Sequence, residues 1–105
     1  MEHTALLYFV GPAGAGKSTL VATLQEWMQH QRYDGVAINL DPGAETVPYQ
    51  AAIDVREKFT LKEIMEEYSL GPNGAQVVCA DLLAVELDWI RSHIEEIDCD
   101  YFLVD

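Results

Sequence analysis

Runs and spacings of apolar residues divide the first part of the chain into alternating strand-like and helix-like stretches. The unbroken apolar run Ala5–Val10 predicts a strand that is buried on both faces. From Lys17 to about Arg32, apolar residues recur at helical spacing with polar residues opposite, which predicts a helix. Val36–Leu40 predicts a second, shorter strand, which Asp41-Pro42-Gly43 ends because proline and glycine break both ladder and helix.

The second half of the chain is more helical. Residues 44–59 have no regular pattern and contain a proline, so we expect a long irregular loop, which in a compact domain favours a functional segment. Thr60-Leu61-Lys62-Glu63 has the spacing of a capping box and begins a helix. Ala75 to Ile97 is the longest helical pattern, and its two apolar stripes suggest that it also contacts a partner. Tyr101–Val104 predicts a third strand, followed by Asp105.

The order strand, helix, strand, helices, strand predicts the α/β class, with a parallel sheet flanked by helices and right-handed crossovers. Three strands are too few to cover these helices well. We therefore expect residues 1–105 to be the N-terminal part of a single larger domain, apparently truncated after its third strand. On this interpretation Tyr101–Val104 is an exposed apolar edge of the sheet.

Composition narrows the class further. Half of the 105 residues are apolar, enough for one modest core, and 18 acidic against 6 basic residues give a net charge of −12. This charge repels phosphate backbones and anionic lipids, so we expect no direct nucleic-acid or membrane binding. The chain has neither a secretion signal nor a membrane-length apolar run, and Cys79 and Cys99 fit buried free thiols. We expect a cytoplasmic protein.

A glycine-rich segment between the first strand and the first helix has the spacing of a phosphate-binding loop. Its glycines let successive backbone N–H groups turn toward a phosphate, and the following helix directs its positive end at the same anion. Lys17 adds an ammonium group for the β- and γ-phosphates, and the Ser18 hydroxyl can ligate Mg²⁺. We predict binding of a nucleoside triphosphate by Gly11, Pro12, Ala13, Gly14, Ala15, Gly16, Lys17, Ser18 and Thr19.

Two carboxylates follow predicted strands at the edge of the sheet where ligands bind in such folds. Asp105 directly follows an apolar strand. In proteins that have this phosphate-binding loop, a second motif is also an apolar strand followed by a carboxylate, and that carboxylate holds the hydration shell of magnesium. Asp41 would lie near the γ-phosphate and help to orient magnesium or the attacking water. Either residue could instead be an ordinary turn residue.

Gly71-Pro72-Asn73-Gly74 has a simple structural interpretation, in which Asn73 caps a helix that starts near Ala75. Together with the phosphate-binding loop, however, it makes the whole chain resemble the GPN-loop GTPases, in an archaeal-type form. That family is defined by an inserted Gly-Pro-Asn beside a nucleotide-binding core. The resemblance rests on Gly11–Thr19, Asn39-Leu40-Asp41-Pro42, Ile53-Asp54-Val55-Arg56, Met65–Tyr68, Leu70–Ala75 and the strand ending at Asp105.

The resemblance implies a P-loop NTPase core and Mg²⁺-dependent GTP hydrolysis by a homodimer. In the family, the asparagine that matches Asn73 reaches across the dimer interface toward the partner's phosphates. The implied catalytic residues are Lys17, Asp41, Asn73 and Asp105, and the implied metal ligands are Ser18, Asp41 and Asp105. Asp54 and Arg56 match a family stretch, but local ion pairing explains them equally well.

This chain also departs from the family pattern. Family members continue past the residue matching Asp105 with Thr-Pro-Gly-Gln and later carry an Asn/Thr-Lys-x-Asp segment that recognises guanine, and neither occurs here. Gly43 stands where the family usually has alanine. The preference for GTP over ATP therefore rests on the resemblance alone. A related dimeric ATPase or small-molecule kinase, and a nucleotide-dependent adaptor that binds a protein client, stay open as alternatives.

Overall fold

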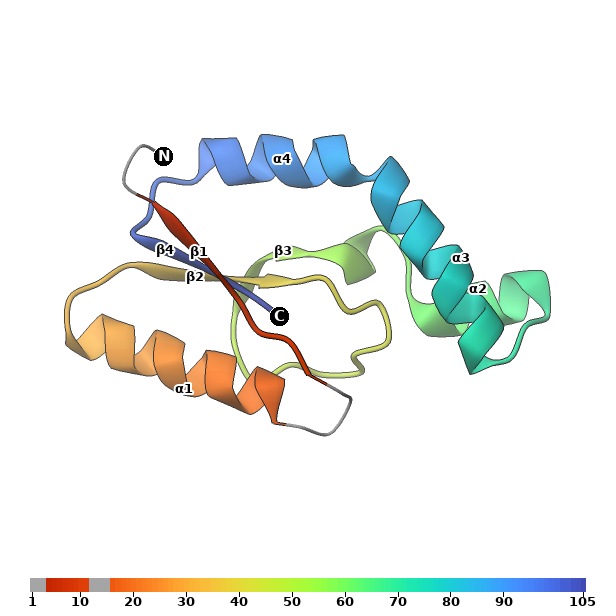
Figure 1. The fold of residues 1–105 in the computed structure, drawn as a ribbon, viewed down its shortest axis with the longest axis horizontal. Helices are drawn as coiled ribbons and strands as arrows, with labels where there is room; N and C mark the ends of the chain where they lie inside the picture. The colour runs from red at the N-terminus through yellow and green to blue at the C-terminus, as the bar shows by residue number, and fades with distance from the viewer. Residues whose placement is uncertain (1–3, 12–15) are drawn as a thin grey trace.

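The computed structural model describes residues 4–11 and 16–105. Its centre is a parallel sheet of four strands in the order β1-β4-β2-β3 (Figure 1). The strands are β1 (Ala5–Tyr8), β2 (Gly35–Asn39), β3 (Ala51–Asp54) and β4 (Tyr101–Val104). The predicted α/β class and parallel pairing are confirmed.

The sheet differs from the sequence-based prediction in two respects. β3 and the short 3₁₀ helix η1 (Val55–Glu57) lie within residues 44–59, which we expected to be irregular. β4 pairs with both β1 and β2, so Tyr101–Val104 is an internal strand and not an exposed edge. The expectation that Ala5–Val10 is buried on both faces is also wrong, because β1 is the edge strand and three of its four residues are exposed.

One helix covers each face of the sheet (Figure 1). Helix α1 (Lys17–His30) packs Val21 and Met28 against Ala37 of β2 and Leu103 of β4. Helix α4 (Leu87–Glu96) covers the opposite face, where a second core cluster combines Trp89 and Ile94 with strand residues that include Ile38, Ile53 and Phe102. The alternation of side chains along each strand therefore supplies both faces with a core.

Residues 75–97 form two helices and not the single long helix that we expected. Helix α3 (Pro72–Val85) ends at Glu86, where α4 begins in a new direction (Figure 1). The apolar residues of this segment thus serve two different contacts. Those of α3 pack against α2 (Leu61–Tyr68) in a cluster that includes Ile64 and Cys79, and those of α4 pack on the sheet.

Local signals explain where the helices begin. Thr60 caps α2, its hydroxyl accepting a hydrogen bond from the Glu63 backbone N–H at 3.2 Å and contacting the Glu63 carboxylate at 3.1 Å. The predicted cap at Thr60 is confirmed, and the Glu63 carboxylate contacts the Thr60 hydroxyl where a full capping box would have it accept from the Thr60 backbone N–H. Both cysteines are buried free thiols, as expected. Among the helices that the structure describes, none is long and apolar enough to cross a membrane.

Candidate functional site

The carboxyl ends of the inner strands meet at one edge of the sheet. The Asp105 backbone N–H donates to the Ile38 carbonyl at 2.9 Å, and the Leu40 N–H donates to the Asp105 carbonyl at 3.1 Å. On the other side of β4, the Phe9 N–H donates to the Val104 carbonyl at 3.0 Å. The segments that follow β1, β2 and β4 are therefore held in register, so the residues after these strands lie close together.

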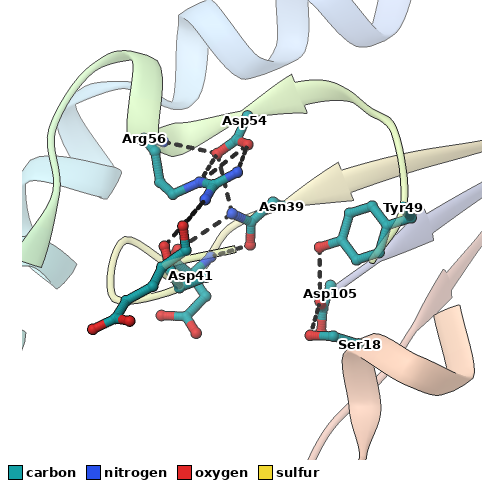
Figure 2. Close-up of polar contacts among 9 residues, drawn as sticks. Ser18, Asn39, Asp41, Tyr49, Asp54, Arg56 and Asp105 are labelled. Atoms are coloured by element: carbon teal, nitrogen blue, oxygen red, sulfur yellow. Dashed lines mark hydrogen bonds and ion pairs between the residues drawn. The ribbon is translucent and has the colours of Figure 1, made fainter. Parts of the chain in front are cut away.

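The first turn of α1 contacts this edge. Gly16 precedes the helix with a φ of 82°, a left-handed conformation that favours glycine. It places Ser18 so that its hydroxyl donates a 2.6 Å hydrogen bond to Asp105 Oδ2 (Figure 2). The structure thus brings together two of the three predicted metal ligands, 87 residues apart in the sequence.

Tyr49 is a third member of this group, and the sequence analysis did not single it out. Its phenolic hydroxyl donates to the same Asp105 Oδ2 at 2.7 Å (Figure 2). Burial raises the pKa of Tyr49 far above its ordinary value, and the hydrogen bond to Asp105 and the negative charge of that carboxylate add to the effect. The phenol therefore stays protonated and acts as a donor to the carboxylate.

Asp41 lies in a separate hydrogen-bonded group, organised by the fully buried Asn39 (Figure 2). The Asn39 carboxamide accepts from the Asp41 N–H at 3.0 Å and donates to Asp54 Oδ1 at 3.1 Å. The exposed Asp41 carboxylate accepts from the Gly43 N–H at 2.9 Å, which is an Asx turn. The turn interpretation of Asp41 and its predicted role near the γ-phosphate are compatible, because only one carboxylate oxygen is used in the turn.

Arg56 connects the loop after β2 to the end of β3 through hydrogen bonds and an ion pair. It forms a bidentate ion pair with Asp54, whose shortest contact is 2.6 Å, and it donates to the carbonyls of Ala44 and Glu45 at 3.1 Å. The side-chain hydrogen bonds from Arg56 hold the pKa of Asp54 below its ordinary value. Local ion pairing of Asp54 and Arg56, which the sequence left open, is what the structure shows.

The loop passes close to α2 at Gly43. A Cβ atom added there would lie 3.2 Å from Leu61 Cδ2 and 3.3 Å from Asp41 Oδ1, so glycine allows the close approach. Beyond the loop lies a cavity of about 930 Å³ whose walls include Tyr49, Arg56 and Met65. Neither Ser18 nor Asp105 lines it, and of the group around Asp105 only Tyr49, among the described residues, contributes to its wall.

The structure describes only some of the other predicted phosphate-binding residues. Lys17 is the first residue of α1 and is partly buried, and Thr19 is exposed in the same turn. Gly11 is described and exposed. Four predicted phosphate-binding residues lie outside the described part of the chain: Pro12, Ala13, Gly14 and Ala15.

Asn73 lies in the first turn of α3 and is exposed. The helix begins at Pro72, and its N-cap residue is Gly71, so Asn73 falls inside the helix and does not cap it. The structural interpretation of Asn73 as a cap for a helix near Ala75 is therefore wrong. The reason is that proline favours the first helical position, which moves the start of the helix ahead of the asparagine.

The oxygen ligands present suit Mg²⁺ bound together with phosphates. Within residues 4–11 and 16–105, no group of three or more His, Cys, Asp or Glu side chains is arranged to hold a metal ion by itself. Ser18 and Asp105 offer one hydroxyl and one carboxylate. Mg²⁺ commonly binds to one or two such protein groups and takes its remaining ligands from water and substrate phosphates.

A parallel sheet in which a glycine-rich loop leads into α1, and in which the α1 serine contacts a carboxylate at the end of a neighbouring strand, defines a P-loop nucleotide-binding protein. A family model described as "Conserved hypothetical ATP binding protein" matches residues 9–105. The chain belongs to this family, and relatives of the chain carry the name GPN-loop GTPase.

Relatives and a solved structure agree with this assignment. The chain is 40% identical over 96 residues to GPN-loop GTPase 3 of Kluyveromyces lactis and 41% identical over 96 residues to GPN-loop GTPase 3 of Saccharomyces cerevisiae. Each alignment covers 91% of this chain and 35% of the relative. The crystal structure of a GTPase in apo form from Pyrococcus abyssi superimposes with a TM-score of 0.88 at 37% identity, covering all of this chain and 42% of that one. The chain thus spans about a third of the length of the curated relatives.

Proposed function

We propose that these residues form the phosphate- and magnesium-binding part of a GTPase of the GPN-loop type, within a single P-loop GTPase domain. The observation that carries the proposal is the 2.6 Å hydrogen bond from Ser18 to Asp105, directly after the glycine-rich loop. This contact joins the residue suited to ligate Mg²⁺ to the carboxylate suited to hold its water shell. The names of the relatives and of the solved structure support GTP as the substrate.

The proposed reaction is in-line attack of water on the γ-phosphate. Lys17 and the backbone N–H groups of the loop stabilise the negative charge of the β- and γ-phosphates. Ser18, Asp41 and Asp105 would hold Mg²⁺, which supplies charge neutralisation at the phosphate oxygens. Asp41 also helps to orient the attacking water, a role supported by its exposed carboxylate at the carboxyl end of β2.

Asn73 completes the proposed site from the partner subunit of a homodimer. Its exposed position at the start of α3 leaves the carboxamide accessible to a second chain. A carboxamide donates a hydrogen bond without adding charge beside an already anionic γ-phosphate.

We propose that the protein is cytoplasmic.

The experiment compares nucleotide binding and turnover in the wild type and in Ser18→Ala, with and without Mg²⁺. We expect Ser18→Ala to lose most of the Mg²⁺-dependent tightening of GTP binding and most of the turnover. Ser92→Ala is the matched control, since Ser92 only bonds to a carbonyl within α4, and it should behave as the wild type. Unchanged Mg²⁺-dependence in Ser18→Ala would contradict the assignment.

ATP must be tested beside GTP, because the description of the matching family model refers to ATP binding. Tighter binding and faster turnover of ATP would favour the related ATPase. Triphosphate binding with negligible turnover would favour the adaptor alternative, in which nucleotide binding controls a protein client.

A further inference from the structure

One carboxylate oxygen of Asp105 receives two hydrogen bonds. Asp105 Oδ2 accepts from Ser18 at 2.6 Å and from Tyr49 at 2.7 Å (Figure 2). The second oxygen, Oδ1, accepts no hydrogen bond from the residues that the structure describes. Because the Asp105 backbone is also fixed between Ile38 and Leu40, these two donors determine the orientation of the carboxylate.

Tyr49 is a rigid donor. Tyr49 is 8% exposed and belongs to the core cluster that joins α1 to the sheet through Val21, Met28 and Leu103. A phenol held in this way keeps its hydroxyl in one place at low conformational cost. By contrast, the hydroxyl of Ser18 serves as a metal ligand in the proposed function.

Tyr49 also belongs to the loop that carries Asp41. Residues 40–50 connect β2 to β3, with the group around Asn39 and Arg56 holding one end and Tyr49 lying at the other. The loop therefore contacts the Asp105 carboxylate directly through the Tyr49 hydroxyl. A change in the position of this loop would alter a hydrogen bond to that carboxylate.

We infer that Tyr49 is a positioning residue, which holds Oδ2 of Asp105 so that Oδ1 is available for the hydration shell of the nucleotide-bound metal ion. This inference rests on the proposed function and extends it to a residue outside the phosphate-binding loop. Through Tyr49, the loop that carries Asp41 is coupled to the metal-binding carboxylate.

The test uses Tyr49→Phe, which removes one hydroxyl and keeps the ring in the core. In the native protein, the affinity for a non-hydrolysable GTP analogue is measured with Mg²⁺ and with EDTA. We expect Tyr49→Phe to reduce the Mg²⁺-dependent tightening about three- to tenfold, the scale of the net contribution of one ordinary hydrogen bond. Affinity in EDTA should be unchanged.

Two controls separate positioning from packing. Tyr101 packs against the same cluster, and its hydroxyl makes no hydrogen bond within the described part of the chain. Tyr101→Phe therefore removes a hydroxyl without removing such a bond. Val47→Ala loosens the same loop and cluster without touching Asp105. Both should keep the wild-type ratio of the two affinities, even where Val47→Ala lowers the unfolding temperature.

An equal loss of affinity in both conditions, or a Tyr49→Phe ratio equal to that of Tyr101→Phe, would overturn the inference. The proposed function is tested separately by Lys17→Ala. If Lys17→Ala weakens triphosphate binding and Tyr49→Phe keeps the wild-type ratio, only the role of Tyr49 is wrong. If the wild type itself shows no Mg²⁺-dependent GTP binding, both the proposed function and the role of Tyr49 are wrong.

Discussion

At the scale of single residues, the position of Asp41 depends on side chains that come from two strands. Asn39, at the end of β2, accepts a hydrogen bond from the Asp41 backbone N–H. Arg56, paired with Asp54 at the end of β3, donates to the backbone carbonyls of Ala44 and Glu45 in the loop after Asp41. Asn39 is fully buried, and each polar group of its carboxamide has a partner. A buried polar group of this kind specifies one conformation, because any alternative would leave it unsatisfied.

Asp54→Asn should destabilise the protein at neutral pH. The amide nitrogen cannot accept from Arg56, so we expect a loss of about 1–2 kcal/mol in unfolding free energy, between the values for exposed and buried ion pairs. Glu86→Gln is the matched control, since its pair with Lys58 is long at 3.9 Å and more exposed. It should change the unfolding free energy by less than about 0.5 kcal/mol.

The Asp54 effect also has a defined pH dependence. The folded state lowers the pKa of Asp54 below its ordinary 3.8, so its contribution is complete above that value and is lost as pH falls further. Denaturant unfolding at several pH values should show a constant difference between wild type and Asp54→Asn from about pH 5 upward, shrinking below about pH 4. A difference that grows on acidification would contradict the ion-pair assignment.

Lys17→Ala should weaken triphosphate binding about ten- to hundredfold, the loss of a charge-assisted contact to the outer phosphates. Diphosphate binding should fall less and nucleoside binding hardly at all. Lys62→Ala, an exposed lysine on α2, is the control and should leave all three affinities unchanged. Triphosphate affinity that survives Lys17→Ala would exclude the phosphate-binding role of the loop.

The sequence was sufficient to predict Ser18 and Asp105 as members of one site, because Ser18 follows the glycine-rich loop and Asp105 follows an apolar strand, the two motifs that combine in such proteins. It was not sufficient for Tyr49 and Asn39. Tyr49 lies 56 residues from its partner Asp105, in a loop with no periodic pattern. Asn39 is the last residue of β2, where nothing in the apolar pattern indicates that its carboxamide organises the loop after it.

At the scale of helices and strands, elements that depend on contacts between residues close in the sequence are easier to predict than elements that depend on contacts between distant residues. The start of α2 was predictable because the capping box is a contact between residues three apart. β3 was not, because Ala51-Ala52-Ile53-Asp54 has little β-propensity of its own and gains its structure by pairing with β2. The irregular register of that pairing adds to the difficulty.

Thr60→Ala should remove the cap of α2 and lower the unfolding free energy by about 1 kcal/mol. Thr23→Ala is the matched control, since Thr23 is exposed within α1 and alanine has the higher helix propensity. It should leave stability unchanged or slightly raised. Equal effects of the two substitutions in thermal unfolding would argue against a stabilising cap at Thr60.

Asn73→Ala should reduce turnover and leave GTP affinity, helix content and stability nearly unchanged. Since Gly71 and not Asn73 is the N-cap of α3, no loss of a cap accompanies the substitution. Gln76→Ala, an exposed residue on the next turn of α3, is the control and should keep wild-type turnover. A drop in stability with normal turnover would contradict the catalytic role.

Mixed dimers test whether Asn73 acts across the interface. In a heterodimer of Asn73→Ala and Lys17→Ala subunits, one of the two sites combines a wild-type loop with a wild-type Asn73 from the partner. Partial recovery of turnover is expected, although each homodimer is nearly inactive. Heterodimers without recovery would show that Asn73 does not act in trans.

At the scale of the whole molecule, the strand order determines which strand is buried and where Asp105 lies. Placing β4 between β1 and β2 buries Phe102, Leu103 and Val104 and puts Asp105 beside the start of α1. A sequence-based order of three strands could not show this, because an apolar run fits an edge or an interior strand equally well. The α2–α3 pair extends beyond β3, away from α1 (Figure 1), so Asn73 in α3 and Ser18 in α1 belong to different parts of the fold.

The 105-residue chain by itself should bind triphosphates weakly, with Mg²⁺-dependence and little preference between GTP and ATP. In the proposed function the polar groups of Ser18 and Asp105 bind phosphate and metal, whereas the segment that recognises guanine in family members does not occur in the sequence. Turnover should be low, because binding energy from the base is not available to position the phosphates. Parallel titrations with GTP and ATP and a turnover assay measure this. Strong GTP selectivity with multiple turnovers would show that these residues suffice for the complete activity.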